Sequence, residues 1–252
     1  GFFEILIVVS FLLHILFVNI TVGSSALAVY QEIKGIRSGR KEDDRLASQL
    51  AHHTSVLKSI AVVLGVAPLL LISVIYTQYF YPSTILIGKA WLSLLIILIV
   101  AFLILYVYKF TWDKMQLIRK KRVHVLIGAT GSALLLFVPL IFIVNVVSML
   151  YPDMWEGSKG FFDGLTYYPQ VWQRYFHFIL ASFALSGFYL YFWNHRLQKA
   201  GAKDKTDEVM QKRGKRLGLQ VMIGTTALQF VTGFWLLMNF ESEIRLLYMG
   251  ED

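Results

Sequence analysis

The stretch ILIVVSFLLHILFVNITVGSSALAVY, residues 5–30, decides the fold of this chain. It contains no Asp, Glu, Lys or Arg, and about 20 mostly apolar residues suffice for an α-helix to cross the hydrocarbon of a bilayer. Five further apolar runs follow it, at 56–78, 85–108, 125–150, 171–193 and 217–240. The sequence therefore predicts an all-α integral membrane protein, a bundle of six transmembrane helices that forms a single domain over residues 1–252.

The composition excludes the ordinary soluble class. Of the 252 residues, 56% are hydrophobic and only 16% are charged, whereas soluble domains carry about 25% charged residues. The chain has no cysteine, which excludes disulfides, thiolate metal sites, iron–sulfur clusters and covalently attached haem. The first run is too long for a signal peptide and lacks its basic flank, so we expect it to be retained.

Most of the 24 Lys and Arg residues lie in three alternate connections. They are Lys34, Arg37, Arg40, Lys41 and Arg45; then Lys109, Lys114, Arg119, Lys120, Lys121 and Arg122; then Arg196, Lys199, Lys203, Lys205, Lys212, Arg213, Lys215 and Arg216. The positive-inside rule places these connections in the cytoplasm. The acidic residues of the other connections and of the C-terminus are Asp153, Glu156, Asp163, Glu241, Glu243, Glu251 and Asp252. Both termini are therefore predicted to lie outside, and the net charge of +8 reflects topology rather than nucleic-acid binding.

Two histidines lie within the predicted spans. His14 is in the first run and His177 is in the fifth, both in the outer half of the membrane. Ionisable residues at membrane depth are functional candidates by default. A pair at similar depth in a cysteine-free chain supports two interpretations equally, ligation of haem b and hydrogen bonding between helices.

Four more histidines lie close to the basic connections. They are His52 and His53 at the start of the second predicted helix, His124 at the start of the fourth and His195 at the end of the fifth. One interpretation is that they are interfacial residues with access to water. The other is a second haem between the helices at 56–78 and 125–150, which would give two haems across the membrane.

Several short motifs carry a family resemblance. Leu13 to Gly23, LHILFVNITVG, resembles the first-helix signature of subunit I of cytochrome bd quinol oxidases. Further matches follow in order along residues 5–193: Leu-Gly-Val-Ala at 64–67, Trp-Asp at 112–113 and Arg-Tyr-Phe-His at 174–177. The resemblance implies that His14 ligates a high-spin haem at an oxygen-reducing site. It also implies that His177 is an axial ligand of a low-spin haem b that takes electrons from quinol.

The chain departs from the family pattern in ways that bear on function. The family continues after the sixth helix into a quinol loop and the helix that supplies the methionine partner of the low-spin haem, so we expect a half-length relative. The second ligand is then expected from His14, from Met149 or from a neighbouring subunit. Two family glutamates correspond to Ala101 and Ser93, and a family arginine to Glu4. With no carboxylate inside any predicted span, oxygen reduction by this chain alone is not expected.

These observations predict a haem-b subunit of a bacterial respiratory complex in the cytoplasmic membrane, holding one or two haems. It would pass electrons between membrane quinol or quinone and partner subunits, such as multihaem cytochrome c or iron–sulfur proteins, in contact with lipid and without nucleic acid. The quinone is expected near His177, with Arg174, Asp153, Glu156 or Asp163 beside it. The alternatives are an oxygen reductase assembled from two such chains and a haem-free scaffold or transporter subunit.

Overall fold

The computed structural model describes residues 1–115, 118–240 and 242–250, and all regular structure within them is helical. Six helices are long and apolar enough to cross a membrane. They are α1 (Phe2–Ser38), α2 (Lys41–Ile75), α4 (Gly88–Phe110), α5 (Ile118–Leu150), α7 (Val171–Ala200) and α8 (Lys205–Met238). The prediction of an all-α protein with six transmembrane helices is confirmed.

Shorter helices lie between and after the long ones. They are α3 (Thr77–Leu86), α6 (Phe161–Tyr167) and α9 (Ser242–Met249), with 3-10 turns at Asp113–Met115 and Pro152–Gly157. Glu241, Glu251 and Asp252, together with the side chains of Arg119 and Glu243, lie outside the described residues.

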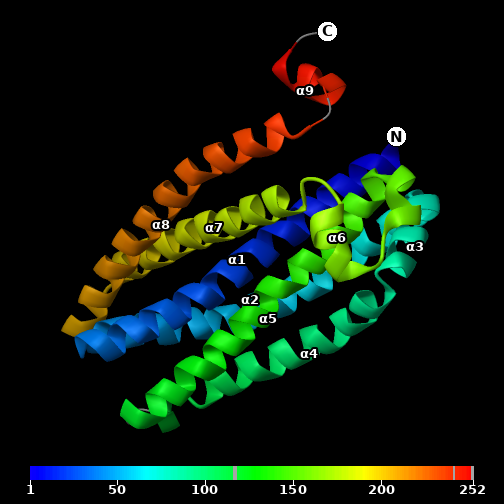
Figure 1. Cartoon of the computed structure of the whole chain (residues 1–252). Helices are drawn as coiled ribbons and strands as arrows, with labels where there is room; N and C mark the ends of the chain where they lie inside the picture. Colours follow the sequence, from blue (N-terminus) through cyan, green and yellow to red (C-terminus); the bar gives the residue numbers. More distant parts are fainter. Residues whose placement is uncertain (116–117, 241, 251–252) are drawn as a thin grey trace.

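The long helices define two ends of the molecule. The N-terminus, α3, α6 and α9 lie at one end, and the turns between α1 and α2, α4 and α5, and α7 and α8 lie at the other (Figure 1). We call the second the basic end, after the Lys and Arg residues of 34–45, 109–122 and 196–216. We call the first the aromatic end, after the aromatic residues of 76–81 and 151–175.

The helices run further into the basic end than the hydropathy predicts. The helix predicted at 5–30 continues to Ser38, and the one predicted at 217–240 begins at Lys205. At 1.5 Å per residue α1 is about 55 Å long, well beyond a hydrocarbon core of about 30 Å. The basic residues therefore extend the helices instead of forming loops, because Lys, Arg, Glu and Gln favour helix although they disfavour lipid.

The turn between α1 and α2 is correspondingly short. Gly39 adopts a left-handed conformation at φ 65°, and its N–H donates to the carbonyl of Gly35 at 2.9 Å. This arrangement ends α1 in the manner that glycine permits, and α2 begins two residues later. His52 and His53 consequently lie well inside α2 and not at its start as predicted, since the second helix begins at Lys41.

Two antiparallel hairpins, α1–α2 and α7–α8, pack together along α1 and α7, while α4 and α5 flank them (Figure 1). We call the contact of α1 with α7 at Asn19, Gly23, Ser182 and Ser186 the serine seam. The Ser182 hydroxyl donates to Asn19 Oδ1 at 2.8 Å, and a Cβ added to Gly23 would lie 2.3 Å from the Ser182 carbonyl oxygen. Small residues and interhelical hydrogen bonds thus bring the two backbones close together, as is typical of helices packed in lipid.

Candidate functional site

The ring of His14 projects from α1 onto α2. Its Nδ1 lies 2.9 Å from the carbonyl oxygen of Ala61. A carbonyl only accepts, so the partner assigns the ring proton of the neutral imidazole to Nδ1 and leaves the lone pair on Nε2. Metal-bound histidines are commonly oriented in this way, by an N–H donated to a backbone carbonyl. His14 therefore has the protonation pattern of an axial ligand.

Gly65 makes room for the His14 ring. A Cβ added to Gly65 would lie 2.7 Å from Cε1 and 3.1 Å from Nδ1 of His14. Contacts under 3.0 Å force a rearrangement, so only glycine at this position lets the ring rest against α2. The Leu-Gly-Val-Ala motif at 64–67, noted in the sequence, is thus spatially part of the His14 site.

His177 has a similar environment on α8. Its Nδ1 lies 3.2 Å from the hydroxyl of Thr232, which itself donates to the carbonyl of Gln229 at 3.3 Å. Because the Thr232 hydroxyl donates its proton to the Gln229 carbonyl, its oxygen accepts a hydrogen bond from His177 Nδ1–H. His177 Nε2 therefore keeps its lone pair, as His14 Nε2 does. Gly233 lies beside the ring, 3.7 Å from Cε1 to an added Cβ. Both histidines therefore fit the role of haem ligand in their donor chemistry.

The serine seam fixes the relative depth of the two histidines. Asn19 and Ser182 are hydrogen-bonded, and His14 and His177 each lie five residues further toward the aromatic end of parallel helices. Five residues advance each helix by about 7.5 Å and turn it by about 140°. The histidines therefore lie in one layer but turn away from the seam, His14 toward α2 and His177 toward α8.

This geometry separates the two candidate ligands. Among the described residues no hydrogen bond or ring contact joins His14 to His177, and each is held by a different helix. The arrangement supports two ligand positions side by side in one layer. It does not support His14 as the second axial ligand of a haem bound to His177.

His124, at the basic end, has both ring nitrogens engaged. Nδ1 lies 2.7 Å from Glu32 Oε1, and Nε2 lies 2.7 Å from the carbonyl oxygen of Tyr108. The Tyr108 hydroxyl donates to Glu32 Oε2 at 2.8 Å. Glu32 and His124 are each 1% exposed and Tyr108 is 2% exposed. We call these three residues the His124 triad; it leaves His124 no nitrogen for a metal.

The remaining histidines do not gather around His124. His52 is exposed and bonds to the Ser48 carbonyl of its own helix at 2.9 Å. His53 Nδ1 lies 3.0 Å from the Tyr189 hydroxyl, and its ring packs edge-on against Trp193. Among the described side chains there is no group of three or more His, Asp or Glu placed to hold a metal ion. The contacts at the basic end thus give no support to a second haem there.

Among the described residues, three buried charged residues were missed by the sequence reasoning: Glu32, Asp43 and Lys58. Glu32 lies two residues beyond the predicted end of the first helix, yet α1 continues through it and buries it. Lys58 lies inside the predicted second span and is 1% exposed. The ammonium lies 3.3 Å from the centroid of the Tyr106 ring and 4.4 Å from that of Phe102, a cation–π arrangement. The presence of a lysine within an apolar run could have identified Lys58 from the sequence.

The residues predicted around the quinone are not gathered into one cluster. Arg174 donates to Gln170 Oε1 at 2.9 Å, and its buried Nε has no hydrogen-bond partner among the residues that the structure describes. Asp163 accepts the Lys159 backbone N–H at 2.9 Å and so orders its own loop. Asp153 and Glu156 are exposed; within the described part of the chain, neither they nor Asp163 form an ion pair with Arg174. Met149 is half-buried in the last turn of α5.

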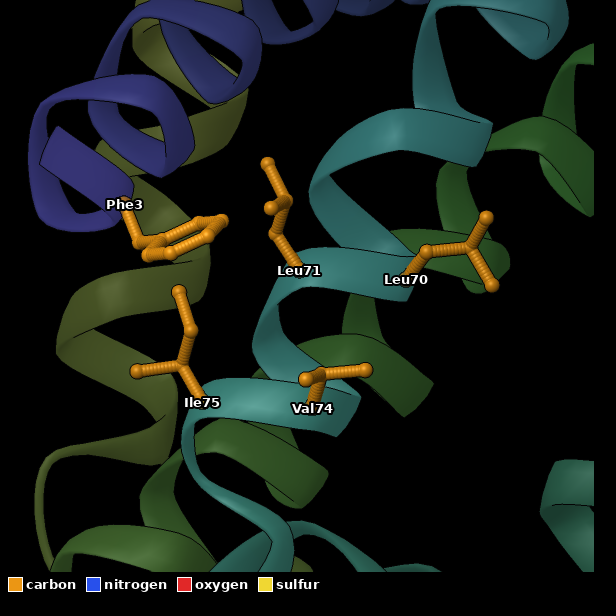
Figure 2. A pocket seen from close by; sticks show the side chains of 5 residues that line it. All are labelled: Phe3, Leu70, Leu71, Val74 and Ile75. Carbon is orange, nitrogen blue, oxygen red and sulfur yellow. The ribbon is translucent and has the colours of Figure 1, made fainter.

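An apolar cavity of about 210 Å³ lies between the first turn of α1 and the aromatic end of α2. Phe3, Leu70, Leu71, Val74 and Ile75 line it, and Figure 2 shows the Phe3 ring pointing from α1 toward Leu71 and Ile75 of α2. These side chains offer no hydrogen bond to a quinone carbonyl. The cavity therefore does not mark the quinone ring site.

Comparison with known protein families assigns the whole of this arrangement to one of them. The family model described as cytochrome bd terminal oxidase subunit I matches residues 5–241. The matched region includes the serine seam, the His124 triad and both candidate ligands. No curated protein matches the chain.

Proposed function

The chain belongs to the cytochrome bd terminal oxidase subunit I family, and from this premise we propose that it is a haem-b-binding membrane subunit of a respiratory complex. It passes electrons between membrane quinol or quinone and partner redox subunits. The family supports a membrane respiratory oxidase subunit that uses haem and quinol in general terms. We propose in addition the haem type, the axial ligands and the partner subunits.

The single observation that carries the proposal is the shared environment of His14 and His177. In each ring Nδ1 is held by an acceptor on a neighbouring helix, Ala61 O or Thr232 Oγ1, while Nε2 is left with its lone pair. Haem would supply one-electron redox chemistry at these positions, with a potential set by axial ligand, burial and hydrogen bonding. The two N–H bonds orient the rings and raise their basicity as ligands.

The position of this layer indicates where electrons enter and leave. His14 and His177 are nearer the aromatic end than the serine seam, so redox partners are proposed to dock at the aromatic end. The basic end then faces the cytoplasm of a bacterial cell, by the positive-inside rule. A second axial ligand would come from Met149 or from a neighbouring subunit.

We place the quinone near His177, at the aromatic end of α7. Arg174 lies one turn from His177, and its unpartnered Nε is available to a quinone oxygen. Gln170 links Arg174 to the Tyr151 hydroxyl at 2.9 Å and to the carbonyl of Asn239 at 3.0 Å. The exposed carboxylates of Asp153 and Glu156 would accept protons released by quinol oxidation.

Oxygen reduction by an assembly of two such chains is the second candidate. Against it, Ala101 is fully buried in an apolar cluster with Val22, Leu105 and Leu135. The hydroxyl of Ser93 bonds to the Ala90 carbonyl at 2.8 Å. Neither position of α4 offers the carboxylate that the family resemblance places there, so this candidate requires a proton donor from elsewhere.

The proposal is tested by counting haem in the purified native complex. A reduced-minus-oxidised spectrum with a pyridine haemochrome assay measures haem b per chain. We expect haem b in the wild type and the loss of part of it in His14→Ala and in His177→Ala, since each ring binds independently. A complex without haem b would contradict the proposal and leave a scaffold or transporter subunit. Oxygen consumption with a high-spin haem signal would favour the second candidate.

A glycine pair provides a matched control that leaves both histidines in place. Gly65→Ala is expected to displace the His14 ring, because the added Cβ would lie 2.7 Å from Cε1, and so to reduce or shift the His14-dependent haem signal. Gly224→Ala adds the same methyl group on α8 with nothing within 4 Å. Equal haem spectra for the two variants would show that His14 is not a haem ligand.

A further inference from the structure

A polar cavity of about 380 Å³ opens between α1 and α8 at the basic end, apart from the candidate haem ligands. Four cationic side chains line it: Lys34 from α1, Arg40 from the α1–α2 turn, and Arg213 and Arg216 from α8. Cations from two hairpins that are distant in the sequence therefore surround one cavity.

The charges around this cavity are poorly balanced. Asp43 accepts from Arg213 Nη1 at 3.1 Å and also from the Ser38 hydroxyl at 3.0 Å. Among the described residues, Lys34, Arg40 and Arg216 form no ion pair within 4.0 Å. Asp43 thus pairs with one of the four cations and does not itself line the cavity, and like charges held around a cavity favour the binding of an anion. Arginine side chains are suited to phosphate in particular, because their planar forks bind two oxygens at once.

A buried polar group also points to a ligand. Gln31 lines the same cavity, is 1% exposed, and its Oε1 has no hydrogen-bond partner among the described residues. Buried polar atoms are almost always satisfied by protein, water or a bound species. Because an amide oxygen only accepts, Gln31 Oε1 needs a hydrogen-bond donor inside the cavity, such as a hydroxyl.

The depth of the cavity identifies the source of the anion. The apolar run of α1 ends at Tyr30 and that of α8 begins at Leu217, so Gln31, Lys34 and Arg216 lie just beyond the hydrocarbon. Leu217 and Gln220 extend the lining into the first turn of the apolar run. This is the level of lipid headgroups, where anionic lipids attract Lys and Arg.

We propose that this cavity binds the phosphate of an anionic phospholipid from the leaflet at the basic end. Lys34, Arg40, Arg213 and Arg216 contact the phosphate, Gln31 Oε1 accepts a hydrogen bond from a headgroup hydroxyl, and the acyl chains leave along Leu217. The lipid joins the first and last hairpins beside the ion pair of Arg213 with Asp43. This proposal does not depend on haem binding.

The test measures lipid-dependent stability of the purified full chain in neutral detergent. Phosphatidylglycerol is expected to raise the thermal unfolding midpoint of the wild type, and phosphatidylcholine is not. Replacing Lys34 and Arg216 by Gln should raise the half-saturating phosphatidylglycerol concentration about thirtyfold, because each basic residue near an anionic membrane surface raises the affinity about fivefold and the two factors multiply. Both side chains reach solvent, so the variant is expected to fold.

The matched control removes the same charge at the same end. Lys199→Gln with Lys203→Gln replaces two exposed lysines outside the cavity and should leave the phosphatidylglycerol response unchanged. An equal loss in both double variants would overturn the proposal in favour of unspecific charge attraction. Equal stabilisation by millimolar inorganic phosphate without lipid would overturn the lipid assignment and leave a soluble phosphate anion. Lipid extracted from the native preparation provides an independent readout: the cavity variant should retain less phosphatidylglycerol than the control.

Discussion

The histidines at the two ends of the molecule differ in what they leave free. His124, at the basic end, uses both nitrogens within a triad that is almost fully buried. His14 and His177, nearer the aromatic end, each use one nitrogen and remain half-buried. A candidate metal-ligating histidine in a membrane helix is therefore identified by a ring nitrogen that makes no hydrogen bond within the protein. Burial alone would have pointed to His124 as the ligand.

The largest expected effect separates the triad from the candidate ligands. His124→Ala leaves the Glu32 carboxylate and the Tyr108 carbonyl without the ring nitrogens that they contact, and each buried polar group that loses its partner costs about 1–3 kcal/mol, more for a charged group. The free energy of unfolding in detergent should fall by this amount. His52→Ala, which removes an exposed ring, is the control and should change little. Equal losses would show that the triad is not a stabilising unit.

A packing variant sharpens the same comparison without removing a polar group. A Cβ added to Gly128 would lie 2.6 Å from the Tyr108 ring, so Gly128→Ala should push that ring away from Glu32. Overpacking of this kind costs about 1–3 kcal/mol. Unfolding experiments on Gly128→Ala and Gly224→Ala should show a loss only in the first. A loss in both would instead indicate a general intolerance of α-helical substitutions.

His53 is intermediate between the fully bonded, buried His124 and the exposed His52, because one of its ring nitrogens bonds to a hydroxyl. Tyr189→Phe removes the bond of 3.0 Å to His53 Nδ1 and keeps the ring, so the expected loss is about 1 kcal/mol. A thermal shift assay of the haem-free chain should place this variant between His124→Ala and His52→Ala. A loss as large as that of His124→Ala would mean that His53 belongs to a wider network.

The smallest expected effect is at an exposed cap of the basic end. The pKa of Asp204 is lowered from 3.8 by the backbone N–H of Asp207 and by Arg45. A lowered pKa contributes stability above the ordinary value that is lost as the pH falls through the lowered value. The small difference in unfolding midpoint between wild type and Asp204→Asn should therefore be constant near neutral pH and decline below pH 3.8. A difference that persisted in acid would exclude the carboxylate charge as its cause.

The fold was predictable because lipid leaves a strong pattern in the sequence. Apolar runs such as 5–30 identify the membrane-crossing helices, but they do not show where the helices end. Lys34 and Arg37 are unfavourable in lipid and favourable in helix, so the pattern is silent about the continuation to Ser38. For the same reason the burial of Glu32 was not predicted from the hydropathy pattern, since Glu32 is buried only because α1 continues past it.

The candidate ligands were predictable in identity and depth, and not in direction. The sequence places His14 and His177 in the outer half of the membrane, and their common layer is consistent with that prediction. Which helix each ring faces depends on how α1 and α7 rotate at the serine seam, and that rotation arises from Gly23 and Ser182 meeting at short range. No local pattern in the sequence specifies this contact between distant segments.

The serine seam also has a consequence for biogenesis. Asn19 and Ser182 are separated by 163 residues, so their contact cannot form while the ribosome has produced only the first hairpin. Until α7 is inserted, Asn19 and Ser24 lack the α7 partners that they contact in the finished bundle. This polar face of α1 therefore stays without its α7 partners for most of the time that the chain is being synthesised.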